Sequence, residues 1–269
     1  MNLAYLIHLW RANRVRLLIV TVALVLWGTL LPIIYDAFGQ QFRELMDSGL
    51  IPFPRQMMQF GGGDIFSLTG SVALGFIHPF AVALSLVFSV GFAGAAIAGE
   101  RQRGTLEVLL ARPISRRVAY TTALVATLLF VAVTIAGLSL GALTGTAVTG
   151  RVDELGPQNL PLVWLNAVLL YMAFATVALA ASVSFDRLTP ALGVALAFVL
   201  ISYFLEALGS LWPDAAFLQD YSLFHYLDAR GALSGQPVAS NFGILAAVIV
   251  AAVAYALVVF PRRDLAAPS

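Results

Sequence analysis

The chain alternates between long apolar stretches and shorter segments that hold most of its charged residues. An α-helix needs about 20 apolar residues to cross a hydrocarbon core of about 30 Å. Six stretches approach or exceed this length and are bordered by charged or polar residues. We therefore predict six transmembrane helices, at Leu17–Tyr35, Val72–Ala98, Val118–Val148, Leu160–Val183, Thr189–Leu208 and Phe242–Phe260.

These stretches are continuous and rich in Leu, Ala, Val and Gly, whereas the strands of a membrane barrel are short and alternate apolar with polar residues. Backbone groups inside lipid must bond within their own segment, which also favours helices. The composition agrees, with 60% hydrophobic residues, 11% charged residues and a mean hydropathy of +0.91. The expected fold is an all-α membrane protein with one transmembrane domain over residues 1–269.

The arginines lie mostly on one of the two sides that six spans define. Four arginines lie on the opposite side, namely Arg43, Arg55, Arg151 and Arg230. The remaining eleven share one side: Arg11, Arg14, Arg16, Arg101, Arg103, Arg112, Arg116, Arg117, Arg187, Arg262 and Arg263. Positively charged short loops stay in the cytoplasm. We therefore expect both termini to be cytoplasmic, in a multi-pass protein of the inner or plasma membrane.

The segment between the second and third predicted spans has the pattern of a short, separate helix. Gly104 lets the chain leave the second span, and Thr105 is the expected N-cap. Glu107 lies in the first turn and Arg112 in the last, as the helix dipole favours, and Pro113 ends the helix. The sequence thus predicts about two helical turns over residues 105–112.

Leu106, Leu109 and Leu110 form one apolar stripe on this short helix, because they are three and four residues apart. A helix of this length is marginal alone and needs a surface to pack against. The stripe suits either the membrane surface or a groove on another protein.

The order E-x-x-x-G-T-L-E-x-L-L-x-x-P-x-S-R, from Glu100 to Arg116, resembles the coupling-helix signature of the type-two ABC transporter permeases. These are the six-helix membrane subunits of ATP-driven exporters. Further similarities are His78-Pro79, Pro190 and the closing segment 260–265. The resemblance therefore covers nearly the whole chain.

The resemblance implies that two permease subunits pair in the membrane, that membrane lipids surround them, and that two ABC ATPase subunits bind below. Glu100 and Arg116 would brace the coupling helix. By this resemblance the ATPase-coupling residues are Glu100, Arg103, Gly104, Thr105, Leu106, Glu107, Leu109, Leu110, Pro113 and Arg116.

The residue types exclude ATP binding by a P-loop within this chain. All 15 basic residues are Arg, and the P-loop requires a Lys to reach the phosphates. We therefore expect no cofactor in this chain, with ATP bound and hydrolysed by a partner subunit. The net charge of +1 also argues against nucleic acid as a partner.

Two other readings of function remain. Gly137-Leu138-Ser139-Leu140-Gly141 matches the G-x-S-x-G of serine hydrolases, although that motif needs a tight turn between a strand and a helix. Glycines at 137, 141 and 145 equally suit close helix packing, which we favour. The chain could also be a membrane scaffold that transports nothing.

Glu206 and His78 are the candidates for a substrate path. Glu206 lies either within the fifth span, where a charge is costly and often functional, or just beyond its end. His78 lies near the outer end of the second span, where the alternative to a functional role is hydrogen bonding at the membrane interface. His8 and His225 lie in separate regions, so we expect no metal site.

Overall fold

A computed structural model describes residues 1–48, 67–111 and 114–263, and every regular element in these ranges is helical. Five helices are long and apolar enough to cross a membrane, and a bent pair supplies a sixth span. The predicted all-α membrane fold is confirmed. The five long helices are α1 (Leu3–Asp47), α7 (Arg116–Val148), α9 (Leu160–Ser184), α10 (Leu188–Leu211) and α12 (Ala239–Arg262).

The second span consists of several helical pieces in place of one continuous helix. It comprises α2 (Leu68–Ile77), α3 (Pro79–Leu86), the π-helical turn η2 (Val87–Phe92) and α4 (Ala93–Ala95), followed by α5 (Ala98–Gln102). The bend between α2 and the α3–α4 stretch is 41°. The span predicted at Val72–Ala98 is therefore present as a bent series of helical pieces.

Proline causes the bend, and neighbouring helices satisfy the backbone that it frees. Pro79 has no N–H, so the Gly75 carbonyl loses its helical donor and accepts from Trp27 Nε1 at 3.3 Å instead. The Phe80 N–H is directed to His78 Nδ1 at 3.3 Å. The Phe76 carbonyl accepts from the Tyr171 hydroxyl at 3.0 Å. A broken span is tolerated in lipid because such partners replace the missing bonds.

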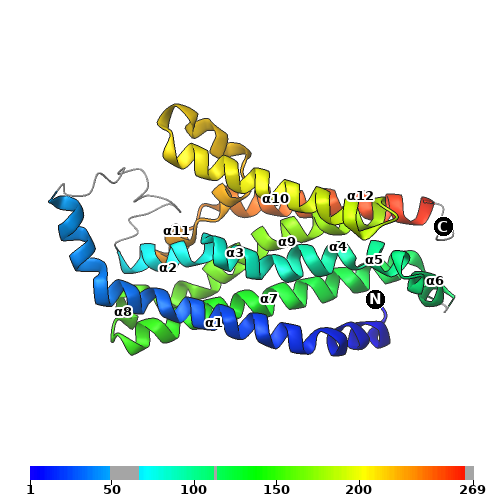
Figure 1. The fold of residues 1–269 in the computed structure, drawn as a ribbon, viewed down its shortest axis with the longest axis horizontal. Coiled ribbons are helices and arrows are strands. Elements are labelled where there is room, and N and C mark those ends of the chain that lie inside the picture. The colour runs from blue at the N-terminus through cyan, green and yellow to red at the C-terminus, as the bar shows by residue number, and fades with distance from the viewer. Residues whose placement is uncertain (49–66, 112–113, 264–269) are drawn as a thin grey trace.

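The first span is also longer than predicted, because α1 runs without interruption far beyond Leu17–Tyr35 at both ends. The other predicted boundaries lie within a few residues of those observed. The N-terminus, the short helix α6 (Thr105–Leu110) and the end of α12 lie together at one end of the bundle (Figure 1). We call this the proximal end, and the opposite one the distal end.

Helices α1 and α7 lie side by side at very short range (Figure 1). A Cβ atom on Gly141 would lie 2.3 Å from the Val25 carbonyl oxygen, and one on Gly145 would lie 2.5 Å from that of Thr29. Gly28 of α1 approaches α7 in the same way, since its Cβ would lie 2.5 Å from the Leu138 carbonyl oxygen. Only glycine permits this approach, so the regularly spaced glycines noted in the sequence serve the packing of α1 against α7.

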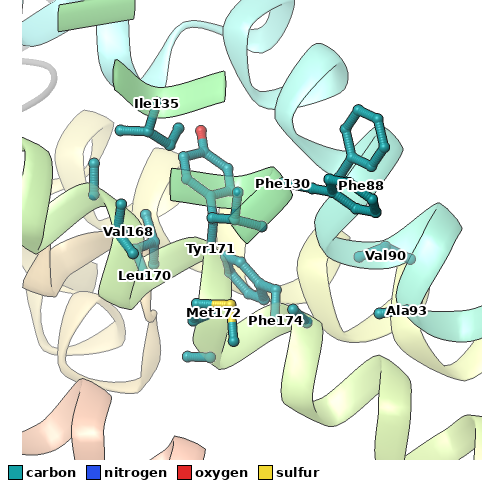
Figure 2. Packing of buried hydrophobic residues seen from close by; sticks show 14 of the residues in the cluster. Phe88, Val90, Ala93, Phe130, Ile135, Val168, Leu170, Tyr171, Met172 and Phe174 are labelled. Carbon is teal, nitrogen blue, oxygen red and sulfur yellow. The ribbon is translucent and has the colours of Figure 1, made fainter. Parts of the chain in front are cut away.

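Helix α9 forms the centre of the bundle. Its apolar stretch is 72% buried, whereas that of α12 is 11% buried. Helix α12 therefore lies at the periphery. Tyr171 and Phe174 of α9 belong to the same buried cluster as Phe88 of η2 and Phe130 of α7 (Figure 2). The Phe88 and Phe130 ring centroids are 5.0 Å apart. One buried cluster thus contains aromatic side chains from three of the spans.

Short helices cover the distal end of the bundle. They are α8 (Val152–Leu155), η3 (Pro157–Asn159), η4 (Pro213–Tyr221), η5 (Phe224–Tyr226) and α11 (Ala229–Leu233). Helix η4 folds back along the distal part of α10 (Figure 1). Buried Asn166 of α9 ties this layer down, because it donates to the Tyr226 carbonyl at 3.0 Å and accepts from the Asp228 N–H at 2.9 Å.

Candidate functional site

Helix α6 leaves the second span through a sharp turn at the proximal end (Figure 1). Gly104 makes the turn with φ at +71°, a backbone conformation that favours glycine. The predicted short helix is present, but it covers Thr105–Leu110 and is shorter than the expected 105–112. Arg112 and Pro113, the predicted last turn and stop, lie outside the described residues.

Gly104, and not Thr105, holds the N-cap position of α6. Thr105 is the first helical residue, and its hydroxyl donates to the Glu100 carboxylate at 2.5 Å and to the Glu100 carbonyl at 3.1 Å. Arg103 donates to the same carboxylate in an ion pair. Glu100 therefore fixes the turn between α5 and α6, because it accepts from residues on both sides of Gly104.

The leucine stripe of α6 packs against the chain's own bundle. Leu106 is 1% exposed, and Leu109 and Leu110 are partly buried against the core. The expectation that the stripe needs another surface is met within the chain. The outer face of α6 carries Glu107 and Val108, and the Val108 side chain is 66% exposed. Another protein approaching α6 would therefore meet these two residues first.

A hollow of about 490 Å³ separates α6 from the first turns of α1. Its walls combine apolar and polar groups, and they are Asn2, Ala4, Tyr5, His8, Glu100, Thr105, Val108, Leu109 and Ile114. Asn2 sets the start of α1 here, because its side chain accepts from the Tyr5 N–H at 2.9 Å and its own N–H donates to Thr122 Oγ1 at 2.8 Å.

Arg116 contacts the end of α12. Its Nη1 donates to the carbonyl oxygens of Phe260 at 3.2 Å, Pro261 at 3.3 Å and Arg263 at 2.5 Å. Carbonyls at the end of a helix have no helical partner, and a guanidinium satisfies them. Arg116 thus ties the start of α7 to the end of α12.

Sequence reasoning missed the polar groups that join α5 to the rest of the proximal end. Asp186 forms ion pairs with Arg101 and Arg263, both at 2.6 Å. Buried Ser182 accepts from the N–H groups of Ile97 and Ala98, at 3.0 and 2.9 Å, where the second span breaks before α5. The sequence did contain one signal for this contact, because Asp186 is the single acidic residue between Glu154 and Glu206.

Glu206 lies inside α10, which continues to Leu211, so the alternative that the helix ends before it was wrong. Glu206 is 7% exposed, and its carboxylate faces η4, where Oε1 accepts from Gln219 Nε2 at 2.9 Å. His78 caps both pieces of the bent span, and its ring packs at a tilt of 40° against that of Trp27, with ring centroids 4.6 Å apart. The two substrate-path candidates therefore have structural contacts of their own, at separate places in the bundle.

Ser139 lies in the interior of α7, and its hydroxyl donates to the Ile135 carbonyl at 3.1 Å. The glycines around it face α1 at van der Waals distance or closer. A hydrolase elbow needs its serine exposed on a tight turn. This arrangement leaves the motif without the geometry of a nucleophile.

The comparisons with known proteins agree with this architecture. The family model described as "ABC-2 family transporter protein" matches residues 11–265. Comparisons with curated proteins and with solved structures found no match. A match over nearly the whole chain, together with the multi-span helical bundle, shows that the protein belongs to the ABC-2 transporter family and is the membrane permease subunit of an ABC transporter.

Proposed function

We propose that this permease is an exporter subunit that forms a homodimer and is driven by a separate ATPase, which docks on the outer face of α6. The observation that carries the proposal is the position of α6. It is a six-residue helix at the proximal end, held on its inner face by the bundle and open on its outer face.

The attachment of α6 suits the transmission of force. Its turn is fixed by Glu100, and its buried Leu106 anchors it in the core. A helix of six residues is not stable alone, so its rigidity comes from these contacts. A push on Val108 or Glu107 would therefore move the spans that α6 connects, and would not simply unfold the helix.

ATP is assigned to a partner chain because the sequence contains no Lys. A P-loop without its Lys lacks the group that reaches the β- and γ-phosphates. Two copies of each subunit are expected from the resemblance to type-two permeases. The same resemblance supports outward transport, the cytoplasmic placement of the proximal end and a location in the inner or plasma membrane.

The test replaces the exposed valine of α6. Val108→Glu places a charge at the centre of the proposed interface, where it would be desolvated without a partner. We expect the affinity for the co-expressed ATPase to fall at least about tenfold, which corresponds to about 1.4 kcal/mol. The readouts are co-purification with the ATPase, the mass of the complex and ATP-driven transport into inside-out vesicles.

Val148→Glu is the matched control, because Val148 is also an exposed valine, 73% accessible, but lies at the distal end of α7. It should retain the ATPase. Unchanged co-purification and transport in Val108→Glu would overturn docking on α6. A cellular activity of the protein that persists, without any transport, when the ATPase is catalytically disabled would instead favour the scaffold reading.

A further inference from the structure

Asp186 lies in the short loop between α9 and α10, where two arginines from different elements meet it. Arg101 Nη1 of α5 and Arg263 Nη2, which follows α12, each lie 2.6 Å from the same oxygen, Asp186 Oδ1. One carboxylate thus links three parts of the proximal end. Arg101 is 9% exposed, so this contact reaches from the protein interior to the surface.

Two further hydrogen bonds hold the same loop. The Leu188 N–H, at the start of α10, donates to Gln102 Oε1 of α5 at 2.9 Å. Arg263 Nη1 donates to the Val183 carbonyl, near the end of α9, at 2.9 Å. The loop is therefore held by α5 on one side and by the end of α12 on the other.

These contacts connect α6 with helices that are distant in the chain. Helix α6 is joined through the backbone to α5 before it and to α7 after it. Arg116, the first residue of α7, reaches the end of α12 directly. Helix α10 is joined to α5 through the loop at its start, where Arg101 contacts Asp186 and Gln102 accepts from the Leu188 N–H.

Stability alone does not account for this arrangement. The Asp186 side chain is 58% exposed, so water screens its carboxylate and limits what the two ion pairs contribute to folding stability. Their effect is geometric, because two charge-assisted contacts to one oxygen fix where the loop lies relative to α5. Removing the carboxylate should therefore loosen this position without unfolding the bundle.

We propose that Asp186 is a positioning residue for ATP-driven transport, which links α5 to the start of α10 so that displacement of α6 also moves α10. The inference rests on the docking of an ATPase on α6 proposed above. Coupling between separate elements needs a demonstrated change in both, so the test measures movement at the far end of α10 and of α7.

The chain contains no cysteine, so single introduced cysteines can be spin-labelled selectively. Trp212, 61% exposed, reports on the distal end of α10, and Val148, 73% exposed, on that of α7. The full-length permease is assembled with its ATPase in lipid nanodiscs. Distances between labels in the two protomers are compared without nucleotide and after trapping with ATP and vanadate.

In Asp186→Asn we expect the nucleotide-driven population shift at position 212 to fall about two- to tenfold, the range that two partly exposed ion pairs can supply. The shift at position 148 should be retained. Asp186→Glu, which keeps the charge, should restore the shift at position 212. A purely structural role would not separate the two reporters in this way.

Asp36→Asn is the matched control, because it removes a partly exposed ion pair with Arg151, 3.0 Å long, at the distal end. It should leave both shifts unchanged. An unchanged shift at position 212 in Asp186→Asn, or an equal loss at both positions, overturns the role of Asp186. A wild-type complex that does not assemble, or shows no shift at either position, overturns the proposed docking itself.

Discussion

The close contact between α1 and α7 can be tested with a single methyl group. In Gly141→Ala the new Cβ would lie 2.3 Å from the Val25 carbonyl oxygen and 3.0 Å from Gly28 Cα. Both neighbours are backbone atoms, so no side chain can rotate away. Because ordinary contact begins at 3.4 Å, the helices must separate locally by about 1 Å.

The cost can be separated from the effect of alanine on the helix. Overpacking of this kind costs about 1–3 kcal/mol. Replacing a helical glycine by alanine alone gains about 0.5–1 kcal/mol. Gly243→Ala in α12 supplies that gain without a clash, because nothing lies within 4 Å of its new Cβ. The difference between the two variants therefore isolates the overpacking.

The assay is thermal unfolding of the detergent-solubilised protein, followed by the loss of monodisperse material on size exclusion. For proteins of this size, 1 kcal/mol shifts Tm by about 2–4 °C. We expect Gly141→Ala to melt roughly 2–12 °C below Gly243→Ala. Equal melting temperatures would show that α1 and α7 are not packed at this distance, and would refute the packing reading of the glycine motif.

Two further predictions concern the breaks in the second span, with the same thermal assay. Ser182→Ala leaves two buried N–H groups before α5 without their acceptor, so the free energy of unfolding should fall by about 1–3 kcal/mol. The control Ser184→Ala should melt close to wild type. Equal melting temperatures of the two variants would contradict the role of Ser182. Tyr171→Phe removes the donor to the Phe76 carbonyl at the 41° bend and should cost about 0.5–1.5 kcal/mol. Tyr221→Phe, at a side chain that is 74% exposed, is its control, and a Tyr171→Phe protein as stable as that control would contradict the account of the bend.

The number of spans and their approximate positions were readable from the sequence, because the bilayer forces every spanning segment to be long, apolar and helical. Four predicted spans agree with the observed helices to within a few residues. The short helix after Gly104 was predicted as well, because the glycine before it and the acidic residue in its first turn are local signals. The sequence did not reveal that the leucine stripe packs on the chain's own bundle, where Leu106 is 1% exposed.

The bend at Pro79 shows the limit of a pattern read along one segment. Hydropathy is the same on both sides of the proline, and the groups that tolerate the break, Trp27 and Tyr171, come from other helices. The same holds for Asp186, whose partners lie 85 and 77 residues away in the chain.

The sequence by itself determined that the protein is a helical membrane bundle with a short helix between its second and third spans, since burial in lipid and local turn chemistry act on each segment separately. The tertiary structure alone decided which face of α6 is free, how the broken span is satisfied and which charges link the proximal ends. The physical reason is that hydrogen bonds and ion pairs between spans depend on how helices are rotated and placed against one another, and the uniform apolarity of these spans leaves little trace of that arrangement in the sequence.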